Sequence, residues 1–296
     1  MTDIGIVGIG SWGKNLIRTF DRLATVRQCC HTGDAQAATW LAEEYPAIDR
    51  TTDLDDLLED PTLDAIVVAT PIQTLAEIAT ASLNAGKHVF VEKPMANTVE
   101  EAEQLAALAG CRSELLFVGY IFVHHPFFRR ASGLAAEGDV TAVELDWRTL
   151  GSFPPDLIRN LVCHPVSVVV SRFGPPGSIA VDTQLALTGD LDRLSLTFDY
   201  HTFETTITVD RVSPIKQYRY GVYTDDGSAR IATDDACYAF DQASLAFETD
   251  DQMGADPLTT ECQRFLDAIA GEVEPITDAA FGNAVFDVLQ QIKDAS

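Results

Sequence analysis

The stretch DIGIVGIGSWG, residues 3–13, decides the fold of the chain. Residues 3–7 are apolar enough for a short strand, and apolar positions at helical spacing follow residue 13. Between them stands G-x-G-x-x-G, which in this strand–turn–helix context predicts a dinucleotide-binding loop rather than a plain glycine turn. The first glycine allows the tight turn, the second admits the pyrophosphate, and the third lets helix and strand approach. The residues predicted to hold the cofactor here are Gly8, Gly10, Ser11, Trp12 and Gly13, with Trp12 packing over the cofactor's edge.

The next strand, expected over Val26–Cys30, should end on the residue that contacts the adenosine ribose. An acid there would grip the hydroxyls of NAD, but this chain has His31 and Thr32. Asp34 has the position of a helix N-cap, and no arginine stands at 32 or 33 to bind a 2′-phosphate. We therefore predict that His31 and Thr32 lie at the cofactor, and the choice between NAD and NADP stays open.

Strand and helix patterns alternate through residues 1–120, which predicts a doubly wound parallel sheet of the Rossmann type. Thr74 is the expected cap of one of the helices, and Thr98 with Glu101 forms a capping box for another. The expected elements after residue 30 are a helix over 35–45, a short helix over 53–58, a strand over 64–69, a helix ending at 85, a strand over 88–91, a helix over 98–109 and a strand over 115–120.

Beyond residue 120 the pattern changes to alternating strands, which predicts a second α+β domain over 121–296 with one large, mostly antiparallel sheet flanked by helices. Its expected helices span 126–137, 156–173, 258–270 and 279–293, and its expected strands span 140–150, 183–188, 194–198, 205–209, 217–223 and 228–232.

The composition excludes several classes of partner. A net charge of −25 and a pI near 4.3 disfavour binding to nucleic acid or anionic membranes. Such self-repulsion is tolerable where salt shortens the Debye length, so we expect a halophile's protein. Without a run of 18 apolar residues or a basic leader, a cytoplasmic location is expected. The six cysteines lack metal-ligand spacing, so we expect reduced thiols and no metal site; His124-His125 also lacks a third ligand.

A second informative stretch is GKHVFVEKP, residues 86–94. Four strand-forming residues are followed at once by Glu92, Lys93 and Pro94. Ligands of open α/β sheets bind beyond the carboxyl ends of the strands, where a lysine can hold its ammonium over a substrate. The alternative reading of Glu92-Lys93 alone is a solvated ion pair before a turn.

Together these motifs resemble the Gfo/Idh/MocA family of NAD(P)-dependent oxidoreductases over nearly the whole chain. The resemblance rests on the glycine loop, on Ala69-Thr70-Pro71, on residues 85–94, and on the pattern from Pro257 to Gly282. Pieces at 118–120, 125–126, 148–151, 164–167 and 213–216 are most similar to the subgroup of nucleotide-sugar dehydrogenases that oxidise UDP-N-acetylhexosaminuronate-type substrates.

The resemblance implies roles for individual residues. Lys93 would lie beside the nicotinamide and polarise the reacting hydroxyl, and His164 would be the general acid/base. The resemblance places Thr70, Pro71 and Glu92 at the cofactor and Tyr120, Arg148 and Asn160 at the substrate. It also implies a homodimer or homotetramer.

Three departures from the family pattern bear on activity: Asn160 replaces the usual Asp, Pro165 follows the histidine, and Leu75 stands where His is common.

Several readings remain as alternatives. Taken by itself, His164 on an apolar helix fits a core histidine, and Arg148 fits an ordinary strand residue. A reductase of a non-sugar substrate, of the biliverdin-reductase type, would have similar length, but the intact Glu92-Lys93-Pro94 counts against it. Asn160 and Pro165 motivate a catalytically impaired cofactor-binding protein as the non-enzyme alternative.

Overall fold

A computed structural model describes residues 1–133, 140–151, 156–242, 244–252 and 254–296. The chain forms two compact units, each built from two segments. Unit 1 consists of Met1–Tyr120 and Leu258–Asn283, and unit 2 of Ile121–Pro257 and Ala284–Ser296. The domain division expected at residue 120 differs in one respect, because residues 258–283 pack with the first unit.

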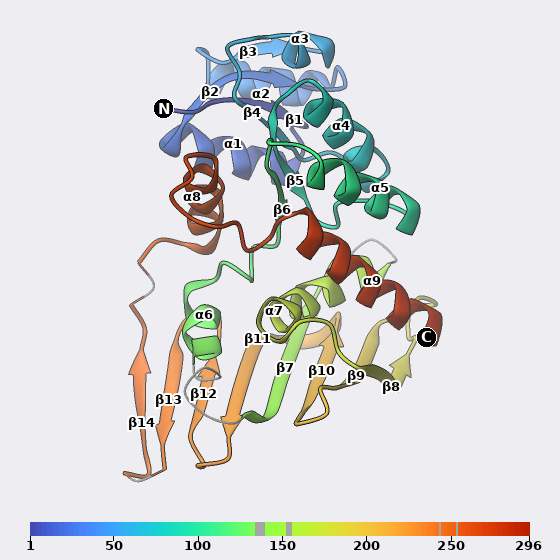
Figure 1. Cartoon of the computed structure of the whole chain (residues 1–296), viewed down its shortest axis with the longest axis vertical. Coiled ribbons are helices and arrows are strands. Elements are labelled where there is room, and N and C mark those ends of the chain that lie inside the picture. Colours follow the sequence, from blue (N-terminus) through green and yellow to red (C-terminus); the bar gives the residue numbers. More distant parts are fainter. Residues whose placement is uncertain (134–139, 152–155, 243, 253) are drawn as a thin grey trace. The chain divides into compact units, whose positions relative to one another are not determined.

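Unit 1 contains a six-stranded parallel sheet with the strand order β3-β2-β1-β4-β5-β6. Helices lie on both of its faces (Figure 1), which confirms the predicted doubly wound fold. Its strands are β1 (Asp3–Val7), β2 (Thr25–Cys30), β3 (Asp49–Thr51), β4 (Ala65–Val68), β5 (His88–Glu92) and β6 (Leu116–Gly119), and its helices are α1 (Ser11–Leu23), α2 (Ala35–Glu44), α3 (Asp55–Leu58), α4 (Ile72–Asn84), α5 (Val99–Gly110) and α8 (Pro257–Ile269).

Helix α8 completes the core of unit 1 with an aromatic cluster. The ring of Phe265 lies 5.6 Å from Phe90, 5.7 Å from Phe117 and 6.1 Å from Phe20, and all four side chains are fully buried. The segment after α8 also pairs with β6, where the amide of Val118 donates to the carbonyl of Thr277 at 2.7 Å. Residues late in the chain therefore belong structurally to the first sheet.

Unit 2 contains an eight-stranded sheet with the order β14-β13-β12-β11-β7-β10-β9-β8, in which only β7 and β10 pair in parallel. This confirms the predicted, mostly antiparallel second sheet. Its strands are β7 (Val140–Leu150), β8 (Ser178–Leu185), β9 (Arg193–Asp199), β10 (Glu204–Asp210), β11 (Val212–Thr224), β12 (Ala229–Ala232), β13 (Cys237–Asp241) and β14 (Ala246–Asp250).

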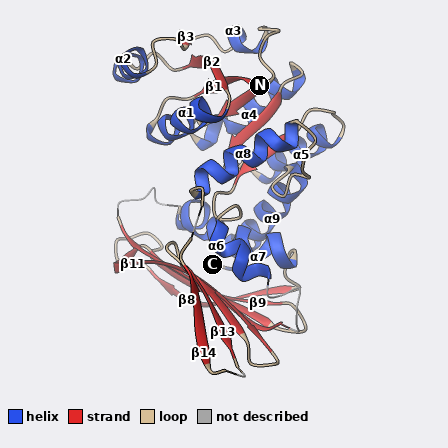
Figure 2. Ribbon diagram, turned by 90° about the vertical axis from the view of Figure 1, so that its left-hand side faces the viewer, coloured by secondary structure: helices blue, strands red, loops and turns tan. Residues whose placement is uncertain are grey.

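Helices cover one face of this second sheet (Figure 2). They are α6 (Pro126–Ser132), α7 (Cys163–Phe173), which continues a π-helix at Ile158–Val162, and the part of α9 (Ala279–Ala295) that belongs to unit 2. Along β7, Val143, Leu145 and Trp147 are buried, while the alternate side chains Glu144 and Arg148 point to the other face. We call that other face, which no described helix covers, the open face.

Several local expectations need correction. Thr74 does not cap α4: the helix begins at Ile72 and the hydroxyl of Thr74 donates to the carbonyl of Pro71 at 3.0 Å. The strand expected over 183–188 ends at Leu185, because the amides of Leu187 and Thr188 donate to Asp192 instead of to a strand. The helix expected over 126–137 is described only as far as Ser132, since residues 134–139 lie outside the described residues.

Two expected helix caps are confirmed. Asp34 caps α2, and Thr98 with Glu101 forms the predicted capping box of α5. All six cysteines are free thiols, and only Cys111 is exposed. Within the described residues, no helix is both long and apolar enough to cross a membrane, and no three His, Cys, Asp or Glu side chains are arranged to hold a metal ion.

Candidate dinucleotide site and catalytic residues

A cavity of about 490 Å³ opens in unit 1 beyond the carboxyl ends of β1, β2 and β4. The strand order reverses between β1 and β4, and ligands of open α/β sheets bind at such a switch point. The predicted cofactor residues that line the cavity are Gly8, Gly10, His31, Thr32, Thr70 and Pro71. The structure thus brings together residues that are as far apart in the chain as Gly8 and Pro71.

The glycine loop is shaped by close backbone approaches. A Cβ at Gly8 would lie 2.5 Å from the carbonyl oxygen of Ala69, and one at Gly13 would lie 2.1 Å from that of Gly8. Gly10, by contrast, faces open space, with no atom within 4 Å of the position of its Cβ. Helix α1 begins at Ser11 without a side-chain cap. Its first N–H groups are therefore available to an anion in the cavity.

Gly13→Ala should disrupt this loop. The added Cβ would force Gly8 and α1 apart, and such overpacking costs about 1–3 kcal/mol of unfolding free energy. We expect the affinity for NADH, measured by nicotinamide fluorescence, to fall at least tenfold. Gly110→Ala is the matched control, because nothing lies within 4 Å of its Cβ position at the end of α5. Equal NADH affinity in the two variants would contradict this account of the loop.

The cavity is acidic next to the end of β2. The Nδ1 atom of His31 accepts a hydrogen bond from the Gly33 amide at 3.0 Å, and Asp34 lines the cavity while capping α2. Burial raises the pKa of the Cys30 thiol, and the nearby charges of Asp53 and Asp56 raise it further. Within the described residues, no lysine or arginine lines this cavity.

Glu92 and Lys93 lie where β5 ends, and Glu92 is tied to the glycine loop. The indole N–H of Trp12 donates to Oε1 of Glu92, and the backbone N–H of Lys93 donates to Oε2 at 3.3 Å. Burial raises the pKa of Glu92 to about 7, although Trp12 and the charge of Lys93 lower it. Trp12 is 40% exposed, so its indole links the loop to the strand end while keeping a face toward solvent.

His164 lies in unit 2 on α7, on the helix-covered side of the second sheet. Its half-buried ring lies 5.0 Å from that of Phe122, which in turn contacts Trp147 at 5.1 Å. Asn160 lies on the π-helix one turn earlier, where its side-chain amide donates to the carbonyl of Asp156 at 2.8 Å. The sequence therefore places Asn160 and His164 on adjoining turns, as expected.

Two predicted substrate residues occupy positions that do not favour that role. Arg148 points to the open face, opposite to Trp147, and both its Nε and a terminal nitrogen contact Asp146 at 2.8 Å. The structure does not bring it together with His164, and its arrangement matches an ordinary strand residue. Tyr120 is fully buried in unit 1, with its ring 5.6 Å from Phe281.

The histidine pair at 124–125 has a packing role. Both side chains are almost fully buried, and His125 stacks on Phe128 at 4.7 Å. Burial lowers the pKa of His125 to about 4. A neutral imidazole that stacks on an aromatic ring is typical of a core residue.

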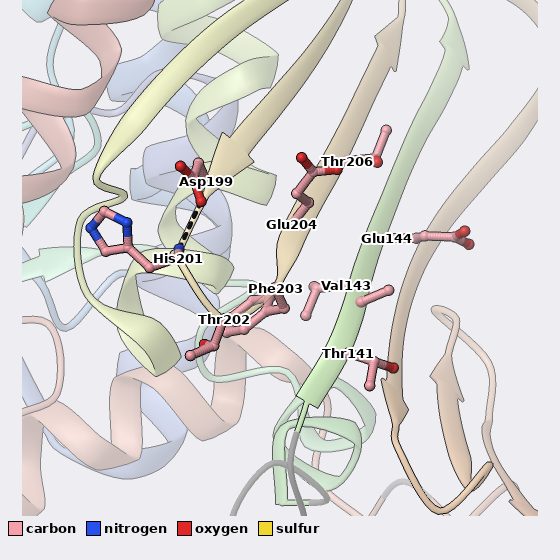
Figure 3. Close-up of a pocket in the computed structure, with 10 residues that line it drawn as sticks. Thr141, Val143, Glu144, Asp199, His201, Thr202, Phe203, Glu204 and Thr206 are labelled. Atoms are coloured by element: carbon pink, nitrogen blue, oxygen red, sulfur yellow. Dashed lines mark hydrogen bonds between the residues drawn. The ribbon is translucent and has the colours of Figure 1, made fainter.

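A second cavity, of about 390 Å³, lies in unit 2 beside the open face (Figure 3). Glu144, Asp199 and Glu204 are among its lining residues, and the backbone N–H of His201 donates to Asp199 at 2.7 Å. None of the predicted site residues lines it. Its acidic, polar lining contrasts with the largely apolar cavity at the glycine loop.

One buried acid, Glu261, belongs to the pattern between Pro257 and Gly282 that carries the resemblance, but no role is predicted for it from the sequence. Glu261 on α8 has no exposed surface, and neither of its carboxyl oxygens has a hydrogen-bond partner among the described residues. The signal was present, because Glu261 stands on the same helical stripe as Cys262, Phe265 and Leu266, which are all buried. An acid in an apolar stripe indicates a buried carboxyl group.

The cavity at the switch point and the glycine loop define a dinucleotide-binding protein. Residues 2–120 match the model of the GFO_IDH_MocA family, described as "Oxidoreductase family, NAD-binding Rossmann fold". Over this stretch the chain is similar to the Gfo/Idh/MocA oxidoreductases, in line with the resemblance of its motifs.

Curated relatives of the chain are dehydrogenases and other oxidoreductases. It is 23% identical to UDP-N-acetylglucosamine 3-dehydrogenase of Acidithiobacillus ferrooxidans, over 98% of this chain and 96% of the relative. It is 30% identical to the uncharacterized oxidoreductase YdgJ of Escherichia coli and 25% identical to scyllo-inositol 2-dehydrogenase (NADP(+)) IolW of Bacillus subtilis. Those two alignments cover 46% and 56% of the respective relative, so the chain spans about half the length of these proteins.

Solved structures share the whole fold. The UDP-N-acetylglucosamine 3-dehydrogenase GnnA of Acidithiobacillus ferrooxidans has a TM-score of 0.88 at 22% identity, over 99% of this chain and 97% of that one. GenD2 from gentamicin A biosynthesis, solved in complex with NAD, has a TM-score of 0.83 at 23% identity, over 99% and 93%. At these identities the likeness establishes the fold of both units.

Proposed function

We propose that the chain is an NAD(P)-dependent oxidoreductase that transfers hydride between a nicotinamide cofactor and a hydroxyl or keto carbon of a sugar or nucleotide-sugar. The observation that carries the proposal is the cavity at the switch point, which the glycine loop lines. The hydrogen bond from Trp12 to Glu92 joins this loop to the end of β5, where Lys93 follows. The full-length likeness to a UDP-sugar dehydrogenase supports the substrate class.

The residues present fit a dinucleotide. Gly10 leaves open space at the start of α1, where free N–H groups would receive the pyrophosphate. His31 and Thr32 would lie at the adenosine end, and Thr70 and Pro71 would line the middle of the cavity. When bound, the nicotinamide would supply or accept the hydride.

In the proposed mechanism, His164 accepts the proton of the reacting hydroxyl, and Lys93 stabilises the charge on its oxygen. Oxidation removes a hydride from carbon and a proton from oxygen, so a base must take the proton. Imidazole titrates near neutral pH, which suits His164 to that step. The ammonium of Lys93 would stabilise the negative charge that develops on the oxygen. Asn160 would bond a sugar hydroxyl or orient His164, without exchanging a proton.

Turnover with a panel of UDP-sugars and free cyclitols tests the proposal. We expect NADH formation or consumption with at least one member of the panel, measured by absorbance in molar KCl. Two alternatives remain, a reductase of a non-sugar substrate and a catalytically impaired cofactor-binding protein. Tight cofactor binding without turnover on any panel member would favour one of these.

We further propose that NAD is preferred over NADP. The ribose end of the cavity carries Asp34, with the charges of Asp53 and Asp56 close by, and such a field repels a 2′-phosphate. All three side chains are exposed, so solvent screens this repulsion and reduces it to about 1 kcal/mol for each charge. We expect NADH to bind at least tenfold more tightly than NADPH, measured by fluorescence titration.

Thr32→Arg should reverse this preference by giving the 2′-phosphate a guanidinium partner. The matched control is Gln104→Arg, which adds the same charge on an exposed position of α5, away from the cavity. An equal gain in NADPH affinity in both variants would mean that overall charge decides, and not the ribose site.

The open face is the proposed oligomer surface. Phe247 on β14 is 59% exposed and Leu245 is 72% exposed, which is unusual for apolar side chains at the edge of a sheet. We propose that a second copy of the chain covers them in a homodimer or homotetramer. A cytoplasmic location and a requirement for high salt remain predictions from the composition.

A further inference from the structure

The buried carboxyl group of Glu261 requires an explanation, because buried polar atoms are normally hydrogen-bonded. Its side chain has no exposed surface, and both oxygens lack a partner among the described residues. Neighbouring positions on α8 contribute Cys262, Phe265 and Leu266 to the apolar core of unit 1. An unpaired negative charge in such surroundings would be strongly unfavourable.

Glu92 is the charged group that acts on Glu261. Burial raises the pKa of Glu261 well above its usual range, and the charge of Glu92 raises it further. Glu92 differs from Glu261 in its contacts, since it accepts hydrogen bonds from the indole of Trp12 and from the amide of Lys93. The two donors favour the ionised form of Glu92, whereas nothing comparable stabilises an ionised Glu261.

We propose that Glu261 holds a proton and stays a neutral acid in the core of unit 1, so that the negative charge is located on Glu92. Of two interacting carboxyl groups, the one with hydrogen-bond donors takes the charge, and Glu92 has two donors whereas Glu261 has none among the described residues. A neutral Glu261 adds no negative charge that would favour protonation of Glu92. Glu92 therefore remains an acceptor for Trp12 in the glycine loop and for the backbone at Lys93.

Few other charges act on this pair. Lys93 is the charged group that lowers the pKa of Glu92, and Trp12 contributes an uncharged donor from α1. On the side of Glu261, burial and Glu92 are the causes of its raised pKa. The neighbouring Cys262 is a buried thiol on the same helix. The protonation of the pair therefore depends on Glu92, Glu261 and Lys93, independently of whether the proposed reaction is correct.

Infrared spectroscopy of the cofactor-free protein tests the proposal directly. At pH 8, above the pKa of about 7 for Glu92, a neutral Glu261 should give the C=O stretch of a protonated carboxylic acid. We expect Glu261→Gln to abolish this band. Glu103→Gln, which changes an exposed glutamate of α5, should retain it. A band absent from the native protein, or one unchanged in Glu261→Gln, would overturn the proposal.

The pH titration of Glu92 gives a second test, because the direction in which its midpoint shifts distinguishes a neutral from an ionised Glu261. It can be followed by the fluorescence of Trp12, with Trp12→Phe identifying that component. If Glu261 is neutral, both Glu261→Gln and Glu261→Met should leave the midpoint nearly unchanged, because neither variant removes a charge and Glu261 makes no hydrogen bond to Glu92. If Glu261 were ionised, both variants would remove a negative charge and lower the midpoint. That result would overturn the proposal even if Glu261→Met proved unstable.

Discussion

Lys93→Met should lower kcat for hydride transfer by about 10²- to 10⁴-fold, the range typical of losing a positioned acid–base or electrostatic group. The reason is that the variant removes the ammonium at the end of β5 while keeping the length and apolar stem of the side chain. The affinity for NADH should change by less than about threefold, because the glycine-loop cavity, which Lys93 does not line, remains intact. Stopped-flow absorbance and fluorescence titration separate the two effects.

Lys293→Met is the control for the loss of a positive charge, since this lysine is exposed in the last turn of α9. It should leave kcat unchanged. His164→Gln should also lower kcat, and the remaining activity should lose its dependence on the ionisation of an imidazole. If Lys93→Met turned over at a rate close to that of the native chain, the proposed role of the lysine would be wrong.

Arg211→Met should destabilise unit 2 by about 3–5 kcal/mol, the usual cost of breaking a buried ion pair by removing one partner. Arg211 is 6% exposed, and its Nε donates to the fully buried Asp192 at 2.7 Å. This pair holds the turn between β8 and β9 against the end of β10. Without the guanidinium, Asp192 would keep its hydrogen bonds from Leu187 and Thr188 but lose its buried counter-charge. Urea unfolding monitored by far-UV circular dichroism measures the difference.

The stabilisation that the Arg211–Asp192 pair provides should decrease in acid. Burial alone would raise the pKa of Asp192, but the amide of Thr188, the guanidinium of Arg211 and the hydroxyl of Thr188 together hold it well below its usual range. The stabilisation is therefore complete above the unfolded pKa of about 4 and decreases as the pH falls below it. The difference between native and variant chains should shrink in acid.

Arg148→Met is the matched control, because Arg148 pairs with Asp146 on the open face with its side chain 40% exposed. A solvated pair of this kind contributes about 0–1 kcal/mol. Equal losses in the two variants would show that the burial of the Arg211 pair does not matter.

Much of unit 1 could be predicted because its signals are local. Apolar runs such as Ala65–Val68 and the glycine loop carry their structure in adjacent residues, and so do the caps at Asp34 and Thr98. The polar edge strand β3 (Asp49–Thr51) has no apolar pattern and was not expected. Strands β13 and β14 were missed for a related reason, since polar and exposed residues interrupt their alternation.

Contacts between residues that are far apart in the chain could not be predicted from local sequence patterns. Helix α8 was correctly expected as a helix, but its membership of unit 1 depends on Phe265 meeting Phe20 and Phe90, which are far away in the chain. In the same way, the sequence identified Glu92 as a candidate site residue, whereas Glu261 entered only as part of a motif and without a role. The orientation of Arg148 likewise followed from the sheet register, in which it alternates with the buried Trp147.

The division of unit 1 into two segments also bears on how the chain is made. Synthesis proceeds from the amino terminus, so residues 1–120 leave the ribosome well before Leu258–Asn283 exist. Until then Phe90 and Phe117 lack the ring of Phe265, and β6 lacks the backbone partner at Thr277. Unit 1 therefore completes its core only after residues 258–283 have been translated, when residues 121–257 of unit 2 have already been made.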